Sequence, residues 1–243
     1  MRELGVVPIE RDTVQRRVHA VLRDRLMSGA FEPGQVLKVA ELAKAFGTSA
    51  MPVREALSRL VAERALESLP NRSARVPNLS PTRLRDLRNV RRAIEGMATA
   101  LAVPRATADD LDTLGSILEA ERDADAKDRI EASVQKNWQF HFTIYGLSGS
   151  AVLLPIIDSL WLQFGPYLRR AAMLFDNRTG EATAYHQKIL AAMARGDATA
   201  ARDGVEADIG RSFDLLLATA EPEPNAPVDI SPAPIKAMPF GRA

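Results

Sequence analysis

The chain has 243 residues, of which 46% are hydrophobic and 26% are charged, a balance typical of globular proteins rather than fibrous or wholly disordered ones. It contains no cysteine, which excludes disulfides and thiolate metal sites. No uncharged apolar run reaches the roughly 18 residues that a membrane span needs, and the first residues lack the apolar core of a signal peptide. We therefore expect a soluble cytoplasmic protein without membrane association.

Charge is distributed unevenly along the chain, although the net charge is only +1. Residues 1–78 contain 13 Lys and Arg against 9 Asp and Glu, which gives this part a balance of +4. Residues 79–220 contain 17 against 19, a balance of −2. The basic N-terminal third is typical of a part that meets an anion such as nucleic acid.

Three short helices are predicted at the N-terminus. The first has Asp12 as its N-cap, with Gln15 three residues later, and ends at the breaker SGAFEPG. Its apolar stripe is Val14, Val18, Val21, Leu22 and Leu26. The second covers residues 39–46 and is ended by Gly47, a position that favours left-handed backbone. After a tight turn, the third repeats the i, i+3, i+4, i+7 apolar spacing over residues 50–61, and the pair predicts a helix-turn-helix.

The segment LESLPNRSARVP, residues 66–77, contains two short extended runs around turn residues, which predicts a β-hairpin. A hairpin directly after a helix-turn-helix is a wing. In such a fold the first turns of the last helix enter the major groove, where Arg54 can contact guanine or a phosphate. Pro52 is tolerated there because first-turn N–H groups have no intrahelical acceptor. The side chains expected to contact DNA are Lys44, Ser49, Met51, Arg54, Ser58, Arg72 and Arg75.

Long helices dominate the rest of the chain. Helical periodicity predicts elements over about residues 82–102, 107–122, 128–147, 150–175, 179–195 and 198–219. We therefore expect a mostly α protein with a winged helix-turn-helix in residues 1–78 and an all-helical bundle for effector binding and dimerisation in residues 79–220. A disordered Pro-rich tail is expected in residues 221–243. The apolar stripe of the first long helix is a candidate dimer surface.

Polar residues interrupt the apolar faces of four of these helices. Arg91 completes the stripe of the first long helix, while Asn137 and His141 lie one turn apart on the third. His186 and Asp208 lie at similar distances on either side of the turn between the last two helices, so antiparallel packing brings them level. An unpaired buried polar group costs about 1–3 kcal/mol. We therefore expect these residues to meet one another or a ligand.

Two imidazoles, a carboxylate and an amide oxygen suit a divalent transition metal such as Zn, Ni, Mn or Fe. The predicted ligands of one ion per chain are Asn137, His141, His186 and Asp208. Arg91 is the predicted clamp for a carboxylate effector, and Trp138 and Tyr185 are further candidates for effector contact. A single histidine would more simply be a hydrogen-bonded core residue, but four converging groups favour a ligand pocket.

Two parts of the chain resemble a known family. The run from LRDRLMSGAFEPG through GTSAMPVREALSRL to ALESLPNRSARV resembles the winged helix-turn-helix of GntR-type transcriptional regulators. The segments RNVRRAIEGMATALA, NWQFHFTIYGLSGSAVLLPIIDSLW and HQKILAAMARGDATAARDGVEADI resemble the FadR-type C-terminal ligand-binding domain, called FCD. The resemblance implies metal ligands at Asn137, His141, His186 and Asp208, with Asn in place of a usual Asp and Asp in place of a usual His. Family members often carry an Arg at the position of Ala50, so the resemblance does not imply the operator sequence.

The resemblance implies a ligand-responsive transcriptional regulator: a homodimer that binds a palindromic double-stranded DNA operator and is a repressor relieved by a small organic acid. No catalytic residues are expected, and the chain is not predicted to be an enzyme. Two alternatives would use the same residues. One is a metal-responsive regulator in which the ion is the effector. The other is a metalloenzyme with two His and one carboxylate, against which stands the lack of a candidate acid, base or nucleophile beside them.

Overall fold

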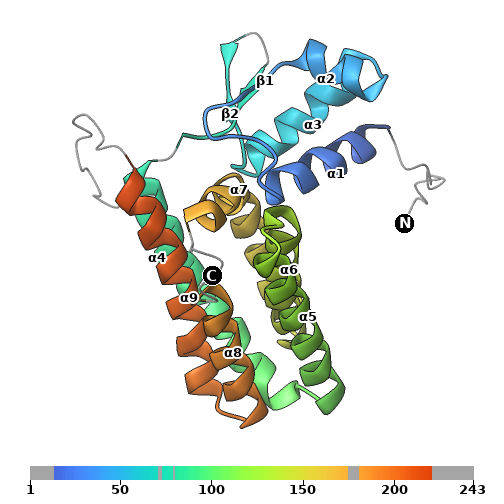
Figure 1. The fold of residues 1–243 in the computed structure, drawn as a ribbon. Coiled ribbons are helices and arrows are strands. Elements are labelled where there is room, and N and C mark those ends of the chain that lie inside the picture. The colour runs from blue at the N-terminus through green and yellow to red at the C-terminus, as the bar shows by residue number, and fades with distance from the viewer. Residues whose placement is uncertain (1–13, 71–72, 79, 175–180, 221–243) are drawn as a thin grey trace, which may run out of the picture.

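The N-terminal part of the molecule is seated on one end of a bundle of long helices (Figure 1). This arrangement, with little strand, confirms the mostly α fold expected from the helical periodicity. The predicted tail and the predicted cap at Asp12 lie outside the residues that the structure describes. The computed structural model describes residues 14–70, 73–78, 80–174 and 181–220.

The three N-terminal helices form where the sequence predicts them. Their bounds are α1 Val14–Met27, α2 Val39–Phe46 and α3 Ala50–Ala62. Gly47 has a φ of 61°, and its N–H donates to the carbonyl oxygen of Lys44 at 3.2 Å while the N–H of Thr48 donates to that of Ala43 at 3.0 Å. These bonds satisfy the last carbonyls of α2, which confirms the predicted left-handed end of this helix.

The buried face of α1 differs from the predicted stripe. Val14 and Val21 are 52% and 42% exposed, whereas His19 is buried. At 100° per residue, the centre of the buried face lies between Leu22 and Leu26, and Val14 and Val21 point roughly 95° and 115° away from it. His19 Nε2 lies 3.2 Å from Glu63 Oε1 just after α3, a contact that ties the two helices together.

A small antiparallel sheet completes the N-terminal part. Its strands are β1 Val36–Leu37, β2 Glu67–Ser68 and β3 Ala74–Arg75, in the order β1-β3-β2. The β2–β3 hairpin confirms the predicted wing. The first strand was not predicted, because two residues are too few to show alternation. It pairs Val36 with Arg75 and so anchors the wing to the segment before α2.

The bundle consists of helices close to the predicted ranges. Their bounds are α4 Pro81–Ala102, α5 Ala108–Ala126, α6 Ile130–Leu147, α7 Leu153–Leu174, α8 Glu181–Ala194 and α9 Ala198–Thr219, with a short 3-10 turn η2 at Val103–Arg105. The Ser80 hydroxyl caps α4, and Thr107 with Asp110 forms a capping box at the start of α5. No helix in the described part of the chain is long and apolar enough to cross a membrane.

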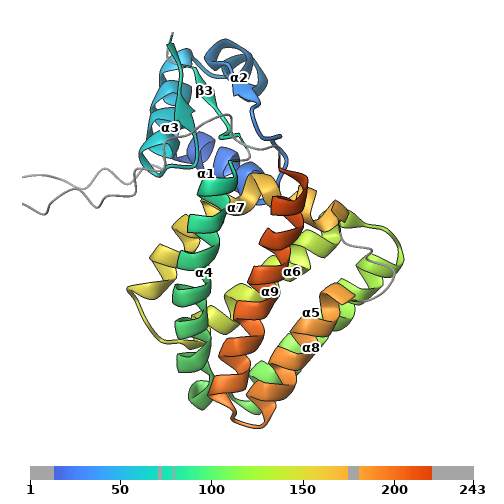
Figure 2. The same ribbon diagram turned by 90° about the vertical axis from the view of Figure 1, so that its left-hand side faces the viewer.

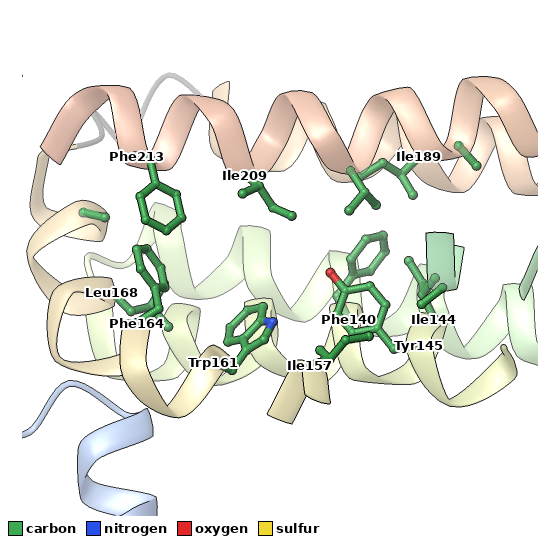
Figure 3. Packing of buried hydrophobic residues seen from close by; sticks show 14 of the residues in the cluster. Phe140, Ile144, Tyr145, Ile157, Trp161, Phe164, Leu168, Ile189, Ile209 and Phe213 are labelled. Atoms are coloured by element: carbon green, nitrogen blue, oxygen red, sulfur yellow. The ribbon is translucent and has the colours of Figure 1, made fainter. Parts of the chain in front are cut away.

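The bundle helices pack around one apolar core. Helix α9 packs along α4 and α8, and α5 packs along α6 (Figure 2). In the core, Phe164 of α7 meets Phe213 of α9, and Phe140 and Ile144 of α6 lie farther along the same interior, beyond Trp161 (Figure 3). This core surrounds the polar residues that the sequence places on the inner faces of the helices.

Helix α7 joins the N-terminal part to the bundle. Its Leu162 packs into the hydrophobic core of the N-terminal part. Gly165 lies so close to the end of α1 that a Cβ there would clash with the carbonyl oxygen of Leu26. The hydroxyl of Tyr167 donates to the carbonyl oxygen of Pro77, in the segment between the two parts, at 3.1 Å. The two parts therefore meet through a packed interface and not only through a linker.

Candidate functional site

Two histidines and an aspartate from three helices meet inside the bundle. His141 of α6, His186 of α8 and Asp208 of α9 are all buried. His141 Nε2 lies 3.1 Å from Asp208 Oδ2, and His186 Nε2 lies 3.7 Å from the same oxygen. One potential ligand atom from each residue lies within 4.8 Å of the others. The structure thus brings together three of the four residues that the sequence suggests as metal ligands.

The fourth suggested residue, Asn137, lies at the edge of this cluster. It is half-buried one turn before His141, and its Nδ2 lies 3.5 Å from His186 Nε2. Because a half-turn of the amide exchanges its nitrogen and oxygen, either atom can face the cluster. The alignment of His186 with Asp208 follows from the antiparallel packing of α8 on α9 across the turn at Gly196, which has a φ of 70°.

The other nitrogen of each imidazole contacts a buried partner. His186 Nδ1 lies 2.7 Å from Glu121 Oε2 of α5. His141 Nδ1 lies 3.1 Å from the hydroxyl oxygen of Tyr145, and this hydroxyl donates its proton to Glu95 Oε2 at 2.6 Å. Since a tyrosine has one proton to give, its oxygen accepts a hydrogen bond from His141 Nδ1. Both Nδ1 atoms therefore carry protons, and both Nε2 atoms are directed at the shared carboxylate.

The cluster concentrates charge away from solvent. Burial lowers the pKa of His186, but Glu121 and Asp208 outweigh this effect and raise the pKa to about 10. Burial also disfavours the charged form of Asp208, yet the neighbouring side chains of His141 and His186 hold its pKa well below the usual range. Without a metal, the extra proton on His186 offsets one of the two negative charges of Glu121 and Asp208. A divalent cation is the alternative way to neutralise them and would displace that proton.

The donor set fits a transition-metal ion. Two imidazole nitrogens and a carboxylate oxygen are common ligands of Zn²⁺ and related ions. Donors that bind a tetrahedral ion at about 2.0 Å lie about 3.3 Å apart. The two separations between histidine nitrogens and Asp208 Oδ2, 3.1 and 3.7 Å, bracket this value, and all three donors lie within 4.8 Å of one another. The contacts of Glu121 and Tyr145 with the opposite ring nitrogens are of the kind that orient metal-binding histidines. His141, His186 and Asp208 could therefore hold a metal.

Arg91 is buried as the sequence predicts, but its guanidinium is bound within the protein. Its Nε and one Nη donate to the carboxylate of Glu95 at 2.5 and 3.1 Å, and its Cζ lies 4.4 Å from the centroid of the Trp161 ring. The charge of Arg91 is thus balanced by a residue one turn away on the same helix, instead of being offered to an effector as expected. The i, i+4 spacing of the pair is a sequence signal for this contact.

The two aromatic residues suggested for effector contact lie in different surroundings. Trp138 stacks on Phe142 with ring centroids 4.7 Å apart. Tyr185 lines a surface hollow of about 580 Å³ between α4, α8 and α9, together with Arg92 and Arg211. A ligand in this hollow, rather than one at the histidine cluster, would contact Tyr185.

The residues suggested for DNA contact gather on one side of the N-terminal part. Met51, Arg54 and Ser58 of α3 are exposed and line a hollow of about 700 Å³ between this helix and the wing. Lys44 and Ser49 are exposed at the turn before α3. This arrangement leaves the opposite face of the helix for packing. Its buried residues are Val53, Ala56, Leu57 and Leu60.

The wing contributes less free charge than the sequence suggests. Arg75 Nη2 lies 2.7 Å from Glu67 Oε2 on the neighbouring strand, so its charge is already balanced before DNA arrives. Arg72 lies outside the described residues. Among the described candidates, Lys44 and Arg54 remain as exposed cations near the turn and the recognition helix.

A winged helix-turn-helix seated on a helical bundle with a buried polar cluster defines a DNA-binding regulator with a sensor domain. Comparison with known families agrees with both parts. The model for bacterial regulatory proteins of the gntR family matches residues 14–76, and the FCD domain model matches residues 86–211. The chain belongs to the GntR family of bacterial transcriptional regulators and carries an FCD domain.

Individual relatives support this assignment. The HTH-type transcriptional regulator McbR of Escherichia coli K12 is 37% identical over 147 residues, which cover 60% of this chain and 66% of McbR. The HTH-type transcriptional repressor GlaR of the same organism is 28% identical over 144 residues, 58% of this chain and 66% of GlaR. The matched stretches thus span slightly less than two thirds of these relatives. The solved structure of E. coli McbR/YncC has a TM-score of 0.79 at 30% identity and covers 86% of this chain and 99% of that chain.

Proposed function

We propose that the chain is a homodimeric repressor whose operator affinity changes when a small organic acid binds at a metal ion in the FCD domain. The observation that carries this proposal is the convergence of the Nε2 atoms of His141 and His186 on Asp208. These residues would hold one divalent ion per chain, Zn, Ni, Mn or Fe, with Asn137 as a fourth donor. Repression is proposed from the likeness to the repressor GlaR. Because its target is DNA, we place the regulator in the cytoplasm.

The metal would supply open coordination positions that accept water or a ligand carboxylate. Residues of the chain prepare the site: Glu121 and Tyr145 hold the two imidazoles with Nε2 inward, and the surrounding apolar core excludes bulk water. Arg91, bound to Glu95, acts in this proposal as a structural residue rather than as the clamp for the acid. We assign the cluster a binding role and no catalytic one.

A short connection between the cluster and the DNA-binding domain supports a response to ligand. Tyr145 and Trp161 donate to the same oxygen, Glu95 Oε2, at 2.6 and 2.9 Å, and Figure 3 shows their side chains on neighbouring helices in the same interior. Trp161 belongs to α7, and the next residue, Leu162, packs into the core of the DNA-binding domain. A ligand that moves His141 would also move Tyr145 and, through Glu95, Trp161. It would therefore shift the part of α7 that packs against the DNA-binding domain.

This connection predicts that removal of the indole N–H of Trp161 uncouples ligand from DNA. In the full chain, Zn²⁺ with citrate or malonate should change the affinity for a duplex selected from a random DNA pool by at least about fivefold. Trp161→Phe keeps an aromatic ring beside Arg91 and should reduce the change to less than about twofold, while Zn²⁺ still binds. Fluorescence anisotropy measures DNA affinity, and calorimetry measures Zn²⁺ binding.

Trp138→Phe is the matched control, because it removes the same N–H from a ring that stacks on Phe142 instead, and in this proposal Trp138 is a packing residue rather than an effector contact. This variant should respond like the unmodified protein. A full response in Trp161→Phe would contradict the connection through α7. A response to Zn²⁺ alone would favour the metal as the effector. An acid that binds without changing operator affinity would be rejected as the effector.

The stripe of α4 that the sequence suggests for dimerisation is mostly buried in the bundle core, including Leu84, Leu87 and Ala98. A second, exposed apolar stripe on the same helix supports the proposed homodimer. Val90, Met97 and Leu101 are 40%, 52% and 37% exposed, and their spacings of seven and four residues put them on one side of the helix. Helix α4 packs against α9 and α7, and the stripe is left facing outward. The same stripe on a second copy would cover it in a two-fold contact, which also matches two DNA-binding domains to a palindromic operator.

Introducing a charge into this stripe should separate the two copies. Met97→Glu would bury a carboxylate against its own symmetry mate, so we expect a monomer of 26.5 kDa instead of a dimer, and weaker operator binding. Light scattering coupled to gel filtration measures the mass. Met173→Glu makes the same change at a residue of α7 that is 63% exposed, and it should leave the dimer intact. An unchanged mass in Met97→Glu would exclude this face.

A further inference from the structure

The first turn of the recognition helix α3 carries no charged side chain. It consists of Ala50, Met51 and Pro52, and Arg54 is the first cation of the helix. Met51 is 61% exposed, whereas the next apolar residue, Val53, is fully buried. An uncharged apolar side chain therefore stands on the face of α3 that is available to DNA, at the end of the helix that enters the groove first.

The surroundings of Met51 belong to the DNA-facing side and not to the core. Met51 lines the hollow between α3 and the wing with Arg54 and Ser58, and Ser73 lies on the wing side of this hollow. Figure 1 shows the wing and α2 at the end of the molecule away from the bundle. The exposure of Met51 thus has no explanation in the packing of the described residues, but it has one in DNA binding.

We propose that Met51 recognises the C5-methyl group of a thymine in each operator half-site. The thymine methyl is the apolar feature that a base pair offers in the major groove. A thioether has no proton to give to a phosphate and only weak acceptor character, and its flexible chain fits closely around a methyl group. In this proposal Met51 contacts one thymine methyl group, and Arg54, a bidentate donor, contacts a polar base edge or a phosphate nearby.

The spacing of the two residues limits where the thymine lies. Arg54 follows Met51 by three residues, which is about 4.5 Å along the helix axis. Successive base pairs are about 3.4 Å apart. The thymine that Met51 contacts therefore lies within about two base pairs of the position that Arg54 contacts.

Deoxyuridine, which is thymine without the methyl group, tests this proposal directly. The full chain first selects an operator from a random DNA pool, and each thymine of that operator is then replaced in turn by deoxyuridine. At one thymine per half-site, the replacement should weaken binding about fourfold, which corresponds to the ~0.8 kcal/mol of one buried methyl. Met51→Ala should bind both duplexes equally, and Met51→Leu should retain the preference for thymine.

Met173→Ala provides a matched control, because it truncates an exposed methionine on α7 and should keep the full preference for thymine. Equal binding of thymine and deoxyuridine at every position by the unmodified protein would overturn the proposal. An unchanged preference in Met51→Ala would overturn it too, because the methyl would then be read by another residue. Failure to select any duplex would remove the DNA-binding role itself, and the two failures are therefore distinguishable.

Discussion

Replacing His141 with alanine is expected to lower the affinity for Zn²⁺ by at least about 100-fold. Loss of a residue that only orients a metal ligand already costs about 10–100-fold, and His141 would be a ligand itself. Its removal also leaves His186 as the one histidine of the cluster that contacts Asp208. Competition with a chromophoric chelator gives the affinity, and mass spectrometry of protein purified without a His tag gives the metal content.

The histidine outside the cluster provides a control for this experiment. The chain has three, and His19 lies beside Glu63 in the DNA-binding domain. His19→Gln should therefore retain about one ion per chain. Asp208→Asn keeps the shape of the buried side chain and should lose the metal as His141→Ala does, which separates loss of a ligand from loss of packing. Equal metal content in the unmodified protein and both cluster variants, including none in any of them, would exclude the site.

The convergence of the cluster residues was predictable because it depends on which face of each helix points inward. His141, His186 and Asp208 interrupt apolar stripes on long helices whose periodicity is strong, and the turn near Gly196 fixes the register of the last two. A buried polar side chain without a hydrogen-bond partner is destabilising, so these inward-facing residues were expected to contact one another. The resemblance to the FCD domain then indicated which of these residues would serve as metal ligands.

The partners of these residues were harder to predict. Tyr145 follows His141 by four residues, but a tyrosine on a buried face reads equally well as core. Glu121 shares the inner face of α5 with Leu114 and Leu118, which was a usable signal because glutamate is rarely buried without a partner. Which acid meets which histidine depends on how α5 and α8 approach each other, and spacing within one helix does not contain that information.

The DNA-binding domain shows a similar division. The end of α2 at Gly47 was readable, because it depends on local backbone chemistry. The strand β1 and the Arg75–Glu67 pair depend on contacts between strands that are two residues long. Such contacts leave almost no periodic pattern in the sequence. The charge of the wing was consequently overestimated, whereas the recognition helix was placed correctly.

Arg54→Ala is expected to abolish specific operator binding. A bidentate guanidinium–guanine contact contributes about 1–3 kcal/mol, and a dimer loses it twice, so affinity for the selected operator should fall by about 30-fold to 10⁴-fold. Among the charged residues of α3, Arg54 is the exposed cation nearest the end of the helix that enters the groove. Fluorescence anisotropy at fixed salt, on the operator and on a scrambled duplex, measures the loss.

Arg59→Ala removes the same charge from the last turn of α3, where Arg59 Nε lies 3.0 Å from Glu63 Oε1, and it should leave operator affinity within about threefold because a rim charge of this kind contributes little. The salt dependence then identifies what Arg54 contacts. If Arg54 contacts a base, Arg54→Ala should lose its preference for the operator over the scrambled duplex. If it binds a phosphate, affinity should fall equally for both duplexes, and the salt slope should decrease by about one per contact. Unchanged affinity would remove Arg54 from the interface and leave Met51 without its neighbouring polar contact.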